Sequence, residues 1–162
     1  MRANFGFATG SSTPTGKISM HDLISCFENR NVEEVEIEMC EAEEVAINQE
    51  DEALADIVAN FAELLPELTG ENTQQDAFEV HYQGRTRTVK LEQCPADEDN
   101  IRRAIRDIIQ PDYEIRVLRS CLGTDTLAFV IDTPEVWQRI DKQFPEVASQ
   151  LLTPFVDEIR FT

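Results

Sequence analysis

Residues 77–91 restrict the fold more than any other segment, because their pattern fits one local structure. Phe78, Val80 and Tyr82 alternate with polar residues, and Gln83 followed by Gly84 supplies the tight turn of a hairpin. An alternation with a period of two places every second side chain on one face of a strand. The segment therefore predicts two antiparallel strands that bury one face.

The rest of the C-terminal half continues as a mixture of helices and strands. Residues 94–111 begin with acids and carry isoleucines at helical spacing, which predicts a helix. Residues 112–119 and 126–131 predict two more strands, and the second is so uniformly apolar that it should be central in its sheet. Two helices are predicted within residues 133–152, and residues 154–161 predict a short strand or a docked terminal segment.

The N-terminal half predicts helices instead. Residues 19–29 indicate a short first helix, and Asn31 can cap a second one with Glu34 at the reciprocal position. The alternative for the second segment is a strand, because apolar and acidic residues alternate from residue 34 to residue 39. We favour the helix, since glutamate is a good helix former and the helical pattern is longer. Its predicted apolar face consists of Val32, Val35, Met39, Ala42 and Ala46.

A third helix is predicted from Glu50 to Leu65, and the polar residues 66–75 predict a linker. Residues 18–162 therefore predict one α+β domain, in which an acidic helical N-terminal half packs with a mainly antiparallel sheet of two β-hairpins, with helices on one face. Residues 1–17 are rich in glycine, serine and threonine and predict a flexible tail or an added extension. No apolar run reaches the length of a membrane span, so we expect a cytoplasmic protein that binds no membrane.

Acidic residues are concentrated in one quarter of the chain. The formal net charge is −18, and residues 31–71 contain 14 acidic residues but no lysine or arginine. A field of this kind repels the phosphates of nucleic acids and attracts basic proteins. We therefore expect a basic protein partner and no nucleic acid.

The densest part of this acidic segment is the predicted partner-binding site. Glutamates at helical spacing repel one another by a few tenths of a kcal/mol per pair, so cationic neighbours would stabilise them. Those neighbours could belong to a partner, to a second copy in a homodimer, or to the same chain through Arg85, Arg87, Arg102, Arg103 and Arg106. The predicted partner-binding residues are Glu33, Glu34, Glu36, Glu38, Glu41, Glu43 and Glu44.

Cysteine and histidine give little support for metal or catalytic chemistry. Cys26, Cys40, Cys94 and Cys121 are widely spaced and form no C-x-x-C pair, which argues against a zinc site and favours reduced thiols. We therefore expect no metal, no cofactor and no catalytic residues. The alternative is a small enzyme that uses carboxylates, or that pairs His81 with Cys94 or Cys121.

The favoured function is that of an acidic cytoplasmic protein-binding module, an inhibitor of the immunity or antitoxin type that captures a basic protein. Such proteins are often small, acidic and without catalytic motifs, and opposite charge accelerates their capture of a partner. The runner-up is an acidic secretion chaperone or adaptor, usually dimeric, that holds a secreted protein along apolar grooves. These interpretations differ in the side chains that the fold must expose.

Overall fold

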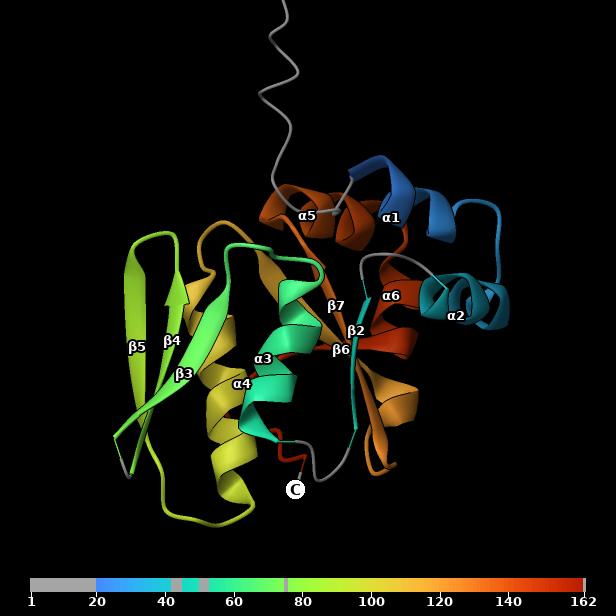
Figure 1. Ribbon diagram of the computed structural model, residues 1–162. Helices are drawn as coiled ribbons and strands as arrows, with labels where there is room; N and C mark the ends of the chain where they lie inside the picture. Colours follow the sequence, from blue (N-terminus) through green and yellow to red (C-terminus); the bar gives the residue numbers. More distant parts are fainter. Residues whose placement is uncertain (1–19, 42–44, 50–52, 75, 162) are drawn as a thin grey trace, which may run out of the picture.

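The computed structural model describes residues 20–41, 45–49, 53–74 and 76–161, which form six α-helices and two antiparallel sheets (Figure 1). The class is therefore α+β, as the sequence predicts. The helices are α1 (Met20–Phe27), α2 (Val32–Cys40), α3 (Leu54–Ala62), α4 (Ala96–Ile108), α5 (Pro134–Gln143) and α6 (Pro145–Leu151), with a 3₁₀ turn η2 (Arg119–Cys121). The strands are β2 (Val45–Gln49), β3 (Thr69–Gln74), β4 (Ala77–Tyr82), β5 (Arg85–Lys90), β6 (Glu114–Leu118), β7 (Thr126–Asp132) and β8 (Leu152–Pro154).

The two predicted hairpins are both present, but they lie in different sheets. β4 and β5 pair through a turn in which Gln83 and Gly84 have positive φ values of 48° and 79°, and this pair belongs to a three-stranded sheet of order β3-β4-β5. β6 and β7 belong to a four-stranded sheet of order β2-β7-β6-β8. Because β7 lies between two neighbours, its prediction as a central strand is confirmed.

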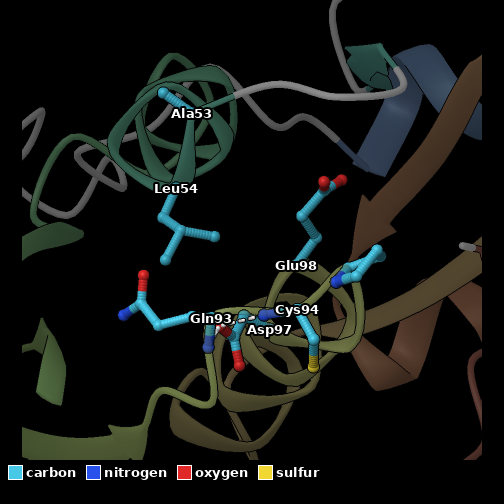
Figure 2. A pocket seen from close by; sticks show the side chains of 7 residues that line it. Ala53, Leu54, Gln93, Cys94, Asp97 and Glu98 are labelled. Atoms are coloured by element: carbon cyan, nitrogen blue, oxygen red, sulfur yellow. Dashed lines mark hydrogen bonds between the residues drawn. The ribbon is translucent and has the colours of Figure 1, made fainter. Parts of the chain in front are cut away.

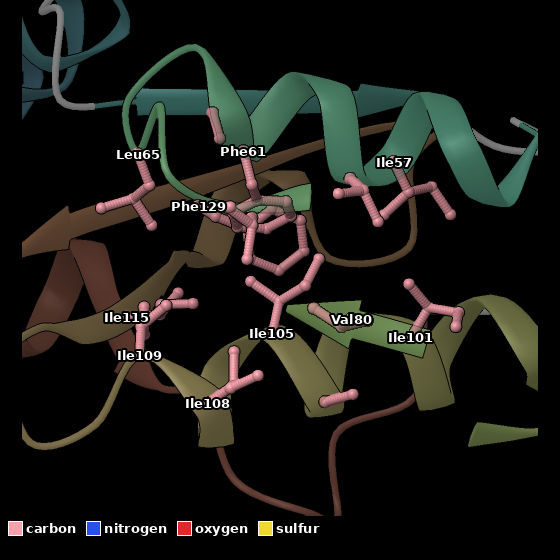
Figure 3. Packing of buried hydrophobic residues seen from close by; sticks show 14 of the residues in the cluster. Ile57, Phe61, Leu65, Val80, Ile101, Ile105, Ile108, Ile109, Ile115 and Phe129 are labelled. Atoms are coloured by element: carbon pink, nitrogen blue, oxygen red, sulfur yellow. The ribbon is translucent and has the colours of Figure 1, made fainter. Parts of the chain in front are cut away.

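Helices cover both faces of the four-stranded sheet, because β7 is apolar on both faces. Phe129 and its alternate neighbours join one core cluster, whereas Ala128 and Val130 join another. α3 and α4 lie between the two sheets in the first cluster, where Phe61, Ile105 and Phe129 meet (Figure 3). α1, α2, α5 and α6 cover the opposite face (Figure 1). The prediction of helices on one face therefore holds for the three-stranded sheet, whereas the four-stranded sheet has helices on both faces.

The second helix is shorter in the structure than the sequence predicts. α2 ends at Cys40 with Glu41 as its C-cap, and Ala46 lies in β2 opposite Phe129 of β7. Val35 and Met39 are fully buried as the helical pattern predicts, and Ala42 falls outside the described residues. The prediction that Ala46 belongs to the helix was wrong. Residues 45–49 form backbone hydrogen bonds with the edge of β7 instead, and local periodicity does not reveal such partners.

The predicted linker is also partly a strand. Residues 69–74 form β3, which pairs with β4 and completes the three-stranded sheet. Gly70 permits this pairing, since a Cβ atom there would lie 2.7 Å from Cε1 of Phe78 and 2.9 Å from Cγ2 of Val58. Backbone hydrogen bonding to β4 therefore overrides the low strand propensity of this polar segment.

The C-terminal segment docks on the first core cluster after the short strand β8. Phe155 and Phe161 both pack on the ring of Phe129, with centroid distances of 5.8 Å and 5.3 Å. This confirms the expectation of a docked terminal segment. Among the helices that the structure describes, none combines the length and the apolar character that crossing a bilayer requires. The predicted tail of residues 1–17 lies outside the described residues.

Candidate partner-binding surface

α2 carries the predicted partner-binding glutamates and is fixed to the protein by two features of its sequence. Asn31 and Glu34 form a capping box, in which each side chain accepts a hydrogen bond of 3.0 Å from the backbone N–H of the other residue. Val35 and Met39 lie on the inner side of the helix and are fully buried in the second core cluster. The first turn and the inner face of α2 are therefore held in place by these contacts.

The described glutamates of this segment have different environments. Glu33 and Glu41 are exposed and form no side-chain hydrogen bond or ion pair with another described residue. Glu38 lies 3.6 Å from Nη2 of Arg30, and Glu36 accepts a hydrogen bond from the hydroxyl of Ser120. Glu43 and Glu44 fall outside the residues that the structure describes.

Ile37 is the residue of this surface that the sequence-based prediction missed. Ile37 is 58% exposed, whereas Val35 and Met39 of the same helix are fully buried. On a helix, residues three and four positions apart are surface neighbours, so Ile37 lies between Glu33 and Glu34 on one side and Glu41 on the other. The signal was present in the sequence, because Ile37 does not fall on the face that Val35 and Met39 define. We call Glu33, Glu34, Ile37, Glu38 and Glu41 the α2 surface.

The five arginines considered as internal partners lie elsewhere and pair with other groups. Arg85 bridges to Asp112 at 3.0 Å, Arg87 lies 3.6 Å from Asp107, and Arg106 bridges to Asp157 at 2.7 Å. The bridge from Arg106 also holds the pKa of the Asp157 carboxyl below its ordinary value. Arg102 is buried beside Asp99, and Arg103 donates to the Asn100 side chain and the Ile159 carbonyl.

His81 is not placed beside either candidate cysteine. Its Nδ1 lies 2.9 Å from the Thr86 hydroxyl, and its Nε2 lies 3.6 Å from Glu71 and 3.8 Å from Glu79. Cys94 lies instead in the loop before α4, and Cys121 lies in η2 near the end of α2. The fold therefore does not assemble the Cys–His pair, which is one of the two forms of the enzyme alternative; the other form uses carboxylates.

Burial raises the pKa of both thiols that lie near α2, Cys40 and Cys121. The carboxylate of Glu36 raises both pKa values further. A higher pKa lowers the fraction of reactive thiolate at neutral pH, so these two positions are poor sites for a nucleophile.

A cavity of about 390 Å³ opens beside Cys94, between the start of α3 and the start of α4 (Figure 2). Its carboxylates are already engaged. Asp97 accepts hydrogen bonds from the backbone N–H groups of Glu92, Gln93 and Cys94, and Glu98 lies 3.5 Å from Arg102. These contacts close the loop onto α4, which is a structural role for this acidic cluster. Among the described residues, no group of three or more histidine, cysteine, aspartate or glutamate side chains is placed to hold a metal.

Comparison of the chain with protein-family models, with curated proteins and with solved structures gives no match. The chemistry of the described surfaces therefore carries the functional proposal.

Proposed function

We propose that this protein is a binding module that captures a basic protein partner on its α2 surface, as inhibitors of the immunity or antitoxin type do. The observation that supports this proposal is the exposure of Ile37 among carboxylates on a well-anchored helix. Glu33, Glu34, Glu38 and Glu41 provide the charged surroundings.

This arrangement has the composition of a protein interface. Binding energy at interfaces is concentrated in a few apolar side chains that enter pockets, and polar residues around them exclude water. A ring of carboxylates accelerates encounter with a basic surface and discriminates against acidic competitors. The matching partner therefore carries an apolar pocket for Ile37, surrounded by lysine or arginine side chains.

The anchoring of α2 favours binding because little conformational freedom is lost. The capping box fixes the first turn, and the two buried side chains fix the inner face before any partner arrives. The backbone of α2 is therefore already ordered before binding, and only the exposed side chains lose conformational freedom when a partner binds, at a cost of about 0.5–1.5 kcal/mol for each immobilised side chain.

The runner-up interpretation, a secretion chaperone, requires a continuous apolar groove. The large apolar side chains that the described residues expose are Ile37 on α2, Ile47 on β2 and Val156 after β8. They lie on three separate segments, so the observations favour a local binding surface over a groove.

The test begins with a photoreactive amino acid at position 37, which identifies the protein that contacts this position in the cell of origin. The purified partner is then titrated against Glu33→Lys/Glu41→Lys. One substitution removes a favourable charge from the helix N-terminus and the other adds one at the C-terminus, so their effects on α2 stability oppose each other. We expect the affinity to fall at least about tenfold, with a weaker salt dependence.

The matched control is Glu63→Lys/Glu158→Lys, which changes the net charge equally at two exposed positions. Both follow or precede residues that pack in the first core cluster, on the side of the four-stranded sheet opposite to α2. This control should retain nearly all of the affinity. A partner that binds the α2 variant as tightly as the unchanged protein would contradict the proposal. Ile37→Asp provides a second test. It should abolish binding, while the unfolding midpoint should fall only slightly, because the new carboxylate repels Glu33, Glu34 and Glu41 by a few tenths of a kcal/mol per pair.

A further inference from the structure

A groove of about 280 Å³ lies between β5 and α4, and its lining is basic in an otherwise acidic protein. Arg87 and Lys90 come from β5, and Arg103 comes from α4. The carboxylate in the lining is that of Asp107, which already bridges to Arg106 at 2.8 Å. The groove therefore has a local excess of positive charge.

The three cations of this groove are weakly neutralised by the described residues. The guanidinium of Arg103 donates to two neutral acceptors, Asn100 Oδ1 at 3.1 Å and the Ile159 carbonyl at 2.8 Å, and its buried Nε has no hydrogen-bond partner. Arg87 approaches Asp107 only to 3.6 Å, and Lys90 forms no ion pair within the described part of the chain. The charge of this groove is thus available to a ligand.

The groove runs beside a free edge of backbone. β5 pairs with β4 on one side, and within the described residues no strand pairs with its other side. Figure 1 shows β5 at the outer margin of the molecule, at the end opposite to α2. An edge strand presents N–H and C=O groups that can pair with an additional strand.

We propose that this edge of β5 binds an extended acidic segment of a partner protein as a fourth strand, with its carboxylates received by Arg87, Lys90 and Arg103. Side chains of an added strand alternate between the two faces of the sheet. Arg87 and Val89 lie opposite the inward-facing Val80 and Phe78, so alternate acids of the added segment would point toward α4 and Arg103. Acids on the other face would lie beside Lys90.

The occupant is an extended peptide for two reasons. The described acidic surface of a second copy is the helix α2, which cannot supply the backbone partners of a strand. A nucleic acid would bring a long array of phosphates against a protein of net charge −18, whereas a short acidic segment brings only a few charges. This site is independent of the α2 surface.

The direct test measures the fluorescence polarisation of a short labelled peptide of valine and glutamate, titrated with the full chain at about 50 mM and about 500 mM salt. Its glutamates occupy both odd and even positions, so that carboxylates point toward both faces of the sheet. We expect binding that weakens with salt and that increases the hydrogen-exchange protection of β5 amides. Lys90→Glu should weaken binding several-fold, and Arg87→Glu/Lys90→Glu about tenfold. Lys142→Glu, a charge reversal at an exposed position on α5, is the matched control and should bind normally.

A second peptide separates strand addition from simple charge attraction. It has the same sequence with methyl groups on all its backbone nitrogens, so it keeps the charge but has no N–H to donate to β5, and it should bind much more weakly. Equal binding of the N-methylated peptide, unchanged binding to Lys90→Glu, or absence of binding to the unchanged protein would each overturn the proposal. A change in the sedimentation of the protein alone on Lys90→Glu would show that the groove joins copies of this chain, and would also overturn it. Glu33→Lys/Glu41→Lys, which changes the α2 surface only, should bind the first peptide with unchanged affinity.

Discussion

Arg102 shows how single residues connect distant parts of this fold. Its side chain is fully buried, Nε donates to Asn48 of β2 at 3.1 Å, and Nη1 donates to Asp99 at 3.4 Å. The other carboxylate oxygen of Asp99 accepts a hydrogen bond of 3.2 Å from the backbone of Phe161. A buried charge is tolerated only when partners compensate its loss of hydration, so this network fixes β2 and the C-terminal segment against α4.

The first prediction concerns this network. Asp99→Ala would remove one of the two carboxylates that lie beside the buried Arg102 guanidinium, and Glu98 would remain at 3.5 Å. It would also remove the acceptor of the Phe161 N–H, so we expect the free energy of unfolding to fall by about 1–3 kcal/mol in urea denaturation. Asp112→Ala removes the exposed partner of Arg85 and should cost at most about 1 kcal/mol. Similar losses in the two variants would contradict a special role for the buried pair.

The second prediction concerns the two tyrosines. Burial, reinforced by Tyr113, Asp112 and Glu67, raises the pKa of Tyr82 to about 12, and burial also raises the pKa of Tyr113. The folded protein therefore holds these protons at a pH where the unfolded chain, with an ordinary pKa of 10.0, releases them. This contribution to stability is complete below pH 10 and is lost as the pH rises toward 12.

Ultraviolet absorbance of tyrosinate checks this directly, and urea denaturation across the same pH range measures the loss of stability. Tyr82→Phe should reduce the loss of stability between pH 10 and pH 12, because this side chain no longer titrates. Titration of both tyrosines at their ordinary pKa in the folded protein would refute the assignment.

At the scale of elements, β2 and β3 owe their conformation to neighbouring strands. β2 contains Asn48 and Gln49, and β3 reads TGENTQ, so neither is a strong strand sequence by itself. Each lies at one edge of its sheet, paired with the strongly apolar β7 or the alternating β4. Short polar edge strands of this kind are also poor templates for aggregation.

The third prediction tests the close packing of β3. Gly70→Ala would place a methyl group against Phe78 and Val58, which belong to two different elements and are both buried. Overpacking of a core costs about 1–3 kcal/mol, so we expect a loss of this size in urea denaturation. Asn72→Ala, at an exposed position on the same strand, is the control and should change stability by less than about 0.5 kcal/mol. A neutral Gly70→Ala would show that β3 can move away from β4 without cost.

At the scale of the whole molecule, β7 belongs to both core clusters. Removing its side chains on one face would therefore weaken the packing of the helical layer on that face. The proposed binding surfaces lie at the two ends of this layered arrangement, with the acidic α2 surface at one end and the basic groove of β5 at the other (Figure 1).

The fourth prediction is that both clusters unfold together. The single tryptophan, Trp137, is buried in the second cluster, whereas Tyr82 is buried in the first and Tyr113 packs against it. Tryptophan fluorescence and tyrosine absorbance should therefore report the same midpoint in urea, because β7 couples the two clusters into one cooperative transition. Two separated midpoints would show that the outer helices melt independently of the sheet.

The sequence alone determined the elements whose signals are local. The hairpin of β4 and β5 follows from alternation and a turn that needs positive φ. α4 follows from the acids in its first turn and its isoleucines, and the central position of β7 follows from its continuous apolar run. Periodicity reports which residues of one segment share a face, so it also identified Val35 and Met39 as the anchors of α2.

Only the tertiary structure decided which segments meet. It assigned Ala46 to a strand, separated the two hairpins into two sheets, and placed Ile37 at the centre of the exposed carboxylates. It also paired Arg85 with Asp112 and Arg106 with Asp157. These outcomes depend on hydrogen bonds and ion pairs between residues far apart in the chain, and local patterns carry no information about such partners.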